Sequence, residues 1–236
     1  MSLDSRHHCP LWTPLHLHRK LLRIYIEAGV VLFLNQLRAD FPGEKLRILD
    51  VGCGYQPYRN FFNAADVEYL GADIPWADVQ PDVVIDEETG RIQSENGAYH
   101  GLVHFQTLEH VPQAMELLRQ CHALLIPGGR MFCTVPFAFE YHPVPGDYRR
   151  WTTEGLRLEL EMAGFQVVKT ENVEGDLPSL LTIIEIYLAS VWGYVLTKPL
   201  FLVMNLFGWM LRNTKKTTLP LTVGAFAQVR KRSPLE

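Results

Sequence analysis

The sequence contains few cysteines, and none of them form a Cys-x-x-Cys pair. They lie at Cys9, Cys53, Cys121 and Cys133, a spacing that argues against a zinc ribbon, a dithiol redox motif or a disulfide scaffold. Three of them fall in apolar or tight-turn segments, as the reduced cysteines of cytoplasmic proteins do. We therefore expect free thiols and a cytoplasmic protein.

The chain also lacks an excess of charge of one sign. Among its 236 residues, 22 are Lys or Arg and 26 are Asp or Glu, so the net charge is -4. This mild acidity gives no global attraction for nucleic acid, and we expect no nucleic-acid partner. Residues 1–14 are polar and carry no apolar segment before a cleavage site, so no secretory signal is expected.

Short apolar strands alternate with helical segments over most of the chain. Periodicity predicts helices at 15–39, 57–64, 112–125 and 153–163, and strands at 46–51, 68–73, 82–86, 101–106, 130–135, 165–170 and 223–230. Strands joined by helices and short links indicate an α/β fold with a mostly parallel sheet and helices on both faces. Such sheets bind ligands at the carboxyl ends of their strands, where strand order reverses.

Residues 177–211 interrupt this alternation with a long apolar segment. The charge-free stretches 186–197 and 199–211 are each shorter than the roughly 20 apolar residues of a spanning helix. We predict a helical hairpin whose second helix begins at Pro199. The expected organisation is an amino-terminal segment and helix (1–43), a ligand-binding core (44–176), the apolar hairpin insertion (177–216), and a last strand with a basic tail (217–236).

A glycine turn and an acid follow the first two predicted strands. In Asp50-Val51-Gly52-Cys53-Gly54 the glycines let the backbone turn sharply and approach a ligand. Asp73 ends the second strand, where an acid accepts hydrogen bonds from ribose hydroxyls. Pro57 replaces the third glycine of a dinucleotide fingerprint, and Asp50 would repel a pyrophosphate. These features favour a cationic, phosphate-free nucleoside such as S-adenosylmethionine, and they disfavour a nicotinamide-dependent oxidoreductase.

Four segments together resemble a class I S-adenosylmethionine-dependent methyltransferase of the small-molecule kind called methyltransferase type 11. They are Leu49–Gly54, Gly71–Ile74, Gln106–Val111 and Leu125–Arg130. The resemblance covers about residues 44–170. It implies a Rossmann-like fold with a seven-stranded sheet, S-adenosylmethionine as cofactor, and in-line methyl transfer to a small-molecule or lipid-linked acceptor. The apolar insertion before the last strand lies outside this pattern.

The resemblance also implies roles for individual residues. It places Gly52 and Gly54 beneath the cofactor, Asp50 near its methionine amino group, Asp73 at the ribose and Asp86 at the adenine amino group. Gln106, which ends the fourth strand, would contact the methionine part and face the acceptor. The expected cofactor-binding residues are Asp50, Gly52, Cys53, Gly54, Asp73, Ile74, Asp86 and Gln106. His110, in a segment that often packs structurally, is a catalytic candidate.

A second polar segment, residues 142–152, follows the fifth predicted strand. Its His142 is a candidate general base, since a free imidazole changes protonation near neutral pH, and Asp147 could orient it. We predict that Tyr148, Arg149 and Trp151 bind the acceptor. The alternative is a loop stapled by Asp–Arg pairing, with Thr152 capping the next helix. The amino-terminal histidines (His7, His8, His16 and His18) have no supporting ligand cluster, so no metal site is expected.

Two questions stay open from the sequence. The first is whether the chain is an enzyme or a catalytically inactive binding module with a methyltransferase fold. The second is the role of the hairpin, which would serve as a lid, a homodimer interface or a peripheral membrane contact. Basic residues beside an apolar helix attract anionic lipid, which favours the membrane and with it a lipid-linked acceptor. The acceptor and its methylated atom cannot be named from the sequence.

Overall fold

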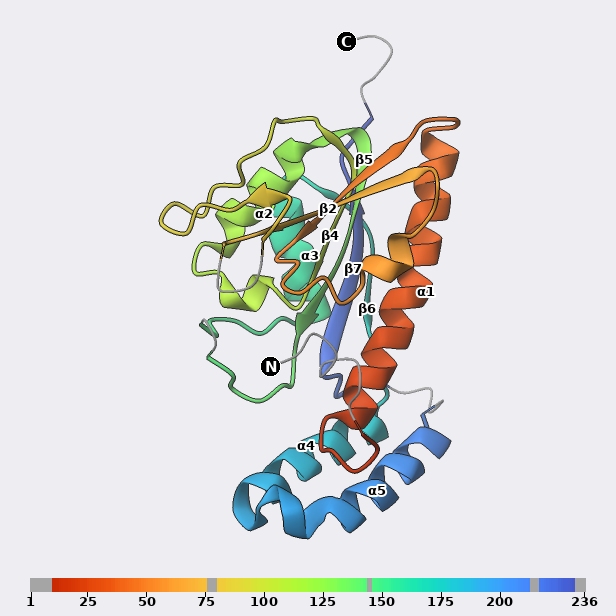
Figure 1. Cartoon of the computed structure of the whole chain (residues 1–236), viewed down its shortest axis with the longest axis vertical. Coiled ribbons are helices and arrows are strands. Elements are labelled where there is room, and N and C mark those ends of the chain that lie inside the picture. Colours follow the sequence, from red (N-terminus) through yellow and green to blue (C-terminus); the bar gives the residue numbers. More distant parts are fainter. Residues whose placement is uncertain (1–9, 76–79, 144–145, 213–216, 232–236) are drawn as a thin grey trace.

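The computed structural model describes residues 10–75, 80–143, 146–212 and 217–231. Its strands form one seven-stranded sheet in the order β3-β2-β1-β4-β5-β7-β6 (Figure 1). They are β1 (Leu46–Val51), β2 (Val67–Asp73), β3 (Val83–Val84), β4 (Tyr99–Phe105), β5 (Leu125–Pro136), β6 (Gln166–Asn172) and β7 (Thr222–Gln228). β7 is antiparallel to both of its neighbours, while the remaining pairs are parallel. The predicted fold class is confirmed.

Helices cover both faces of the sheet, because successive strand residues point to opposite faces. Ile48 packs with Phe33 of α1 (His16–Asp40) in one apolar cluster. The next residue, Leu49, belongs to the opposite cluster, which includes α2 (Ala114–Leu124) and α3 (Thr153–Met162). The Thr152 side chain accepts a hydrogen bond from Gly155 N at 3.0 Å, so the cap predicted for the last of these helices is confirmed.

Three predicted elements differ in the structure. The helix expected at 57–64 is the short 3₁₀ helix η1 (Arg59–Phe62), which follows a turn that bonds Gln56 N to Cys53 O. β3 has two residues instead of a strand over 82–86, followed by an isolated bridge between Ile85 and Ile92. Residues 127–129 lie within β5. The register of its pairing with β4 shifts at these residues: Tyr99 pairs with Leu125, whereas Gly101 pairs with Arg130.

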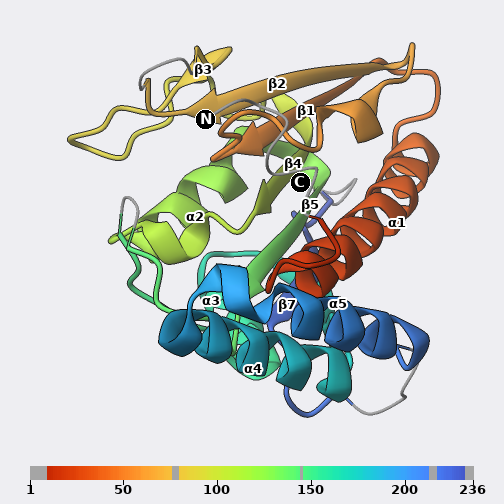
Figure 2. The same cartoon turned by 60° about the horizontal axis from the view of Figure 1, so that its bottom comes forward.

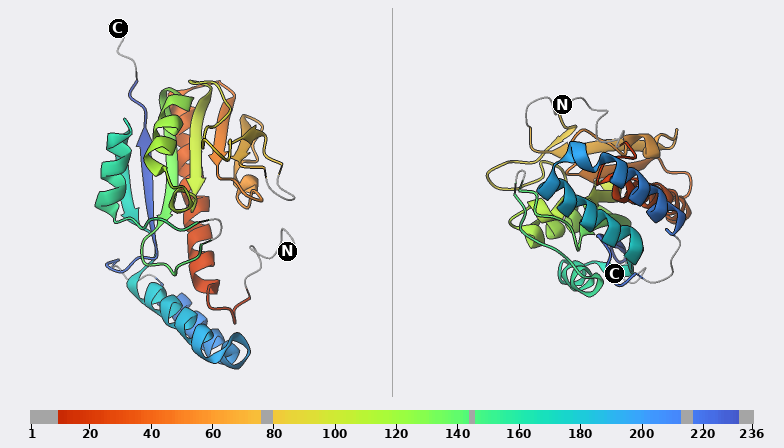
Figure 3. Two further views of the ribbon diagram at one scale, coloured as in Figure 1. Left: turned by 90° about the vertical axis from the view of Figure 1, so that its left-hand side faces the viewer. Right: turned by 90° about the horizontal axis from the view of Figure 1, so that it is seen from below.

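The apolar segment folds as two antiparallel helices, α4 (Asp176–Trp192) and α5 (Tyr194–Met210). Figures 2 and 3 show them side by side, forming a separate layer at the end of the molecule where α1 begins. The predicted start of the second helix at Pro199 is wrong. Gly193, with φ +79°, ends α4 and permits α5 to begin at once, and Pro199 lies inside α5. No helix of the described residues is long and apolar enough to cross a membrane.

Candidate active site

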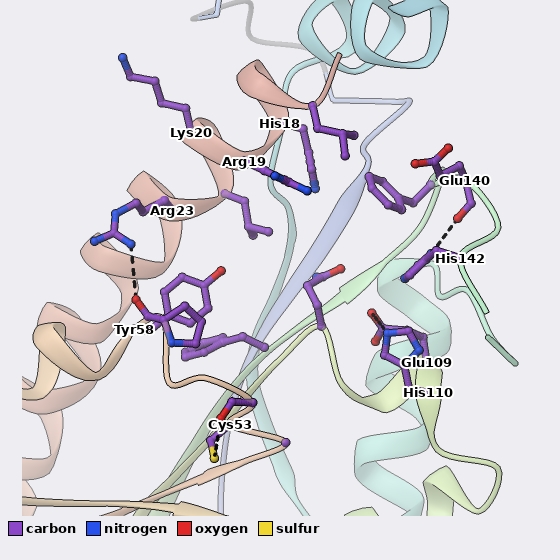
Figure 4. A pocket seen from close by; sticks show the side chains of 18 of the residues that line it. His18, Arg19, Lys20, Arg23, Cys53, Tyr58, Glu109, His110, Glu140 and His142 are labelled. Atoms are coloured by element: carbon purple, nitrogen blue, oxygen red, sulfur yellow. Dashed lines mark hydrogen bonds and ion pairs between the residues drawn. The ribbon is translucent and has the colours of Figure 1, made fainter. Parts of the chain in front are cut away.

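A cavity of about 880 Å³ lies where the carboxyl ends of β1 and β4 meet (Figure 4). The chain continues from β1 toward β2 and β3 on one side and from β4 toward β5 on the other, so strand order reverses there. The walls come from the first turns of α1, the glycine turn after β1, the end of β4, and the loop after β5. The volume lies within the range of small-molecule binding sites.

The glycine turn after β1 requires its glycines. Gly52 has φ +74°, and a Cβ atom added there would lie 2.1 Å from Thr107 Cγ2. Gly54 has φ +51°. A side chain at position 52 would therefore displace the turn that forms the cavity floor.

Gln106, directly after β4, presents an unpaired donor to the same cavity. Its φ of +53° is in the left-handed region, which a non-glycine residue rarely adopts. Its backbone N–H donates to Thr134 O at 2.9 Å. Its side-chain Nε2 is buried and has no hydrogen-bond partner within the described residues. A buried donor of this kind at a cavity wall is typical of a ligand-binding group.

Two acidic residues flank the glycine turn: Asp50 places a buried carboxyl group beside it, and Asp73 forms a hydrogen bond to its backbone. Tyr69 Oη donates to the buried Asp50 carboxylate at 2.5 Å. Burial raises the pKa of Asp50 to about 7 against the opposing effect of that hydrogen bond. Asp73 accepts from the backbone N–H of Gly54 at 2.7 Å and of Ile74 at 2.8 Å, and burial raises its pKa as well. A cationic ligand group would restore the charged form of Asp50.

Three titratable side chains meet at the acceptor side of the cavity. Glu109 and His110 belong to the 3₁₀ helix η2 (Leu108–His110), and His142 comes from the loop after β5. Glu109 is 0% exposed, and burial raises its pKa to about 8. The rings of His110 and His142 stand edge to face with centroids 5.0 Å apart. Phe139 contacts the His142 ring in the same way at 5.3 Å.

The loop that carries His142 is held by the Asp–Arg pair that the sequence left as an alternative. Arg150 forms an ion pair with Asp147 and also donates to Glu140 O at 2.8 Å. The Arg150 guanidinium holds the pKa of Asp147 well below its usual range. Asp147 Oδ2 in turn accepts from His142 N at 2.9 Å and lies 3.4 Å from His142 Nδ1. Asp147 therefore lies beside His142 and holds its backbone, while the orienting role predicted for Asp147 stays a prediction.

The three predicted acceptor-binding residues do not line the cavity. Arg149 donates to the carbonyls of Val111 and Pro112, both at 2.7 Å, and so fixes the loop to the start of α2. Trp151 is buried in the core, and its indole N–H donates to Glu159 at 2.9 Å. Tyr148 points to solvent, with 56% of its surface exposed. Their expected contact with an acceptor thus has no counterpart in the cavity wall.

The predicted cofactor residues divide into three groups. Asp50, Gly52, Cys53, Gly54 and Gln106 line the cavity, together with the catalytic candidates His110 and His142. Asp73 and Ile74 stand behind the glycine turn. Asp86 lies in a separate hollow with residues 89–95, where it accepts from Thr89 N at 2.7 Å. The roles assigned to these residues stay predictions. Burial raises the pKa of Cys53 to about 12, so its thiol is neutral at pH 7.

The contribution of α1 to the cavity was not predicted from the sequence. His16, Arg19, Lys20 and Arg23 follow the i, i+3, i+4, i+7 spacing of one helix face and line the mouth. The helical spacing of these polar residues could have indicated a second functional face of the helix, but the apolar stripe of the same helix was the stronger pattern. Lys20 Nζ lies 4.4 Å from the centre of the Trp209 ring of α5. The mouth is therefore basic and adjoins the hairpin.

The chain is similar in sequence to known proteins. A family model described as a methyltransferase domain matches residues 22–170. Ubiquinone biosynthesis O-methyltransferase from Xanthomonas oryzae pv. oryzae (strain PXO99A) is 27% identical over 141 residues, covering 49% of this chain and 57% of that protein. The protein of the same name from Xanthomonas axonopodis pv. citri is 29% identical with the same coverage. The chain thus spans little more than half the length of these curated relatives.

Solved structures show the same fold. A candidate sarcosine dimethylglycine methyltransferase from Galdieria sulphuraria has a TM-score of 0.58 at 14% identity, over 89% of this chain and 87% of that one. The cyclase SpnF has a TM-score of 0.56 at 16% identity, over 87% and 81%. Because one of these two proteins is a cyclase, likeness of fold alone does not define the reaction.

Proposed function

The chain belongs to the methyltransferase domain family, as a class I S-adenosylmethionine-dependent member. On that premise, we propose that it methylates an apolar, lipid-linked acceptor at an anionic membrane surface. The observation that carries this proposal is the position of the cavity. It opens beside a helical hairpin that exposes apolar side chains and buries polar ones. The cofactor side and the acceptor side of the cavity have different chemistry.

The cofactor side fits S-adenosylmethionine. The glycine turn lets the backbone approach a ligand, and the buried Nε2 of Gln106 supplies a donor for a carboxylate. Asp50 offers a carboxylate toward a positively charged group. We assign the ribose to Asp73 and the adenine amino group to Asp86, which lies in a separate hollow. The cofactor, when bound, supplies an activated methyl group on a sulfonium.

The acceptor side is apolar with basic groups at the mouth and titratable groups at the wall. Leu15, Leu22, Phe105 and Phe139 line it. These side chains would hold an apolar acceptor in line with the methyl group, and alignment alone supplies a large part of the rate acceleration. An acceptor hydroxyl would also need to lose a proton. His142 suits that task because its Nδ1–H donates to Glu140 O at 2.8 Å, which leaves Nε2 to accept a proton.

The hairpin has the reverse of the usual distribution of side chains. Its buried positions include Ser179, Thr182, Glu185, Thr197 and Asn205. Its exposed positions are mostly large and apolar, among them Tyr187, Val191, Trp192, Val195, Leu196, Leu200, Val203, Leu206, Phe207 and Met210. Helices in water bury their apolar face, whereas helices in lipid pack through small and polar residues. This distribution supports an apolar environment around the hairpin.

Charge supports an anionic membrane as that environment. Of the acidic residues of the hairpin, Glu185 is buried, and Asp176 is partly exposed but held by hydrogen bonds. Asp176 is bonded to the backbone N–H of Thr218 and Leu219, and Glu185 is buried with its pKa raised to about 8. Arg212 stacks on Trp209, where its charge remains available beside the apolar face. Each helix has 17 residues, which suits a helix lying in the lipid interface.

Polar contacts dock the hairpin onto α1, at the turns that line the cavity. Asn205 Oδ1 accepts from Leu17 N at 3.1 Å and so caps the start of α1, which has no side-chain cap of its own. His18 Nδ1 is 2.9 Å from Glu174, just before α4. A hairpin immersed in lipid would therefore hold the cavity mouth close to the membrane surface.

Labelled cofactor tests the proposed reaction. Protein, S-adenosylmethionine with a radioactive methyl group, and a membrane lipid extract in phosphatidylglycerol-containing vesicles are incubated together. We expect label in the chloroform-soluble fraction. Label confined to water-soluble products would contradict a lipid-linked acceptor. Failure of S-adenosylmethionine to bind in calorimetry would contradict the enzyme and leave a binding module.

Cofactor affinity should depend on pH through Asp50. Its pKa of about 7 means that the carboxylate is ionised above neutrality and protonated below it. Because the ionised form attracts a cation, S-adenosylmethionine should bind about tenfold more weakly at pH 6 than at pH 8. Calorimetric titration at both pH values measures this change.

The Asp50→Asn variant is the control for that prediction. It keeps the size of the side chain but cannot ionise, so its affinity should be low at both pH values. If the wild-type affinity is the same at pH 6 and pH 8, Asp50 does not provide the charge. If the variant keeps the wild-type slope, another group titrates.

A further inference from the structure

Glu109, His110 and His142 each offer one ligand atom, and these atoms lie within 4.8 Å of one another at the cavity wall. Figure 4 shows Glu109 and His110 of η2 together, with His142 facing them from the loop after β5. We propose that these three side chains form a binding site for one divalent metal ion of the zinc type. The sequence alone gave no expectation of a metal here, because the ligands come from segments about 30 residues apart.

Glu109 is the observation that points most directly to a cation. Its side chain is fully buried, and both carboxylate oxygens lack a hydrogen-bond partner within the described residues. A buried carboxylate without a partner is costly, and such groups are usually paired or coordinate a metal. His110 Nε2 lies 3.9 Å from Glu109 Oε1, too far for a hydrogen bond. A metal ion between these two atoms would satisfy both of them.

Hydrogen bonds to carbonyls hold both histidines in the form that binds metal. His110 Nδ1 pairs with Gly146 O, and His142 Nδ1 pairs with Glu140 O at 2.8 Å. A carbonyl can only accept, so each Nδ1 carries the proton and each Nε2 keeps its lone pair. Metal-ligating histidines are commonly oriented by such bonds from the second ring nitrogen.

Asp147 adds a carboxylate behind His142. Its Oδ2 is 3.4 Å from His142 Nδ1, and the ion pair with Arg150 fixes its position. A carboxylate behind a ligating histidine is a common arrangement around protein-bound zinc. Arg150 makes its direct ion pair with Asp147, and its positive charge also acts on Glu109 from a longer distance. Neither carboxylate oxygen of Glu109 has a hydrogen-bond partner among the described residues.

The ligand set favours zinc over magnesium. Two imidazoles and one carboxylate form a known set of catalytic zinc ligands, whereas magnesium prefers oxygen ligands. Ligand atoms about 2.1 Å from a tetrahedral zinc ion lie roughly 3.4 Å apart. Because the ligand atoms lie within 4.8 Å of one another, no pair needs to approach by more than about 1.4 Å. Because Glu109 and His110 are fixed in η2, we expect His142, on its loop, to make most of this movement.

A fourth coordination position would face the cavity. If the chain acts as a methyltransferase, as proposed above, zinc would take over the task given to His142, because Nε2 of His142 is then a metal ligand and cannot accept a proton. An acceptor hydroxyl bound at the fourth position would lose its proton to water more readily, since zinc lowers the pKa of a bound oxygen. This use of the metal, and the hydroxyl-bearing acceptor it implies, depends on the proposed function. The metal site itself depends only on the three ligands.

Zinc titration of the metal-free full chain tests the site. Calorimetry with ZnCl₂ and a competing chelator, without cofactor or acceptor, should give one saturable site. The Glu109→Gln and His142→Ala variants should each lose more affinity than the roughly 10–100-fold expected for Asp147→Ala, which removes only an outer partner. MgCl₂ should not compete with zinc.

Two control variants separate this site from other histidines. His122→Ala removes an imidazole from α2, away from the cavity, and His7→Ala/His8→Ala removes the amino-terminal pair. Both should bind zinc as the wild type does. The proposal is overturned if no one-to-one binding occurs, if His142→Ala binds normally, or if the amino-terminal variant loses the site. Since these titrations use no cofactor, their failure would leave methyl transfer untouched, and absence of cofactor binding would leave the metal site untouched.

Discussion

Replacement of Gly52 by alanine is expected to abolish binding of S-adenosylmethionine while leaving the protein folded. Two effects combine at this position. A φ of +74° is unfavourable for any residue with a Cβ, at a cost of about 1–2 kcal/mol. The added Cβ would also meet three Thr107 side-chain atoms, the nearest at 2.1 Å, so the turn must move. Because the turn forms the cavity floor, we expect calorimetry to detect no binding at cofactor concentrations that saturate the wild type.

Gly43→Ala provides a matched control. Gly43 has φ +82°, so alanine meets the same backbone penalty, but an added Cβ there would have no atom within 4 Å. This variant should lose some stability and keep its cofactor affinity. Circular dichroism and thermal unfolding of both variants separate loss of fold from loss of the site. Binding to Gly52→Ala within about tenfold of the wild type, equivalent to 1.4 kcal/mol, would contradict the role of the turn.

The elements that sequence reasoning predicts well are those encoded by neighbouring residues. The short, mostly apolar run Leu46–Val51 and the apolar stripe of α1 are local patterns in the sequence, and the buried strand and the buried helix face follow them. The cap at Thr152 depends on residues three apart. The position of the cavity was predictable for a similar reason, because a glycine turn after the first parallel strand lies where strand order reverses.

Long-range contacts explain what the sequence could not predict. Arg149 looks like an anion-binding residue, yet its donors are used by carbonyls of residues 111 and 112. Trp151 looks like a ligand platform, yet its ring is buried in the core and its indole N–H donates to Glu159 of α3. The grouping of Glu109 with His142 exists only after the loop beyond β5 folds back over η2. None of these pairings leaves a periodic or local signal.

Charged residues placed on the exposed apolar face of the hairpin are expected to weaken membrane binding strongly. The Val195→Glu/Leu196→Glu variant places two carboxylates where the wild-type side chains are 73% and 81% exposed. In water these changes should not lower the free energy of unfolding, because neither side chain is buried. In lipid they remove two apolar contacts, worth about 1.5–3 kcal/mol each when fully buried, and add repulsion from anionic headgroups. Affinity for phosphatidylglycerol vesicles should therefore fall by about 100-fold or more.

Vesicle flotation compares the wild type with this variant and with a control that carries the same charge elsewhere. Leu158→Glu/Val168→Glu alters side chains that are 57% and 51% exposed on α3 and β6, away from the hairpin. Because the control adds two carboxylates without touching the hairpin, it should float with the vesicles as the wild type does. Equal loss in both variants would show that net charge alone governs binding. A wild type that ignores vesicles but forms a dimer in light scattering, with Val195→Glu/Leu196→Glu monomeric, would instead make the exposed face a contact between two copies of the chain.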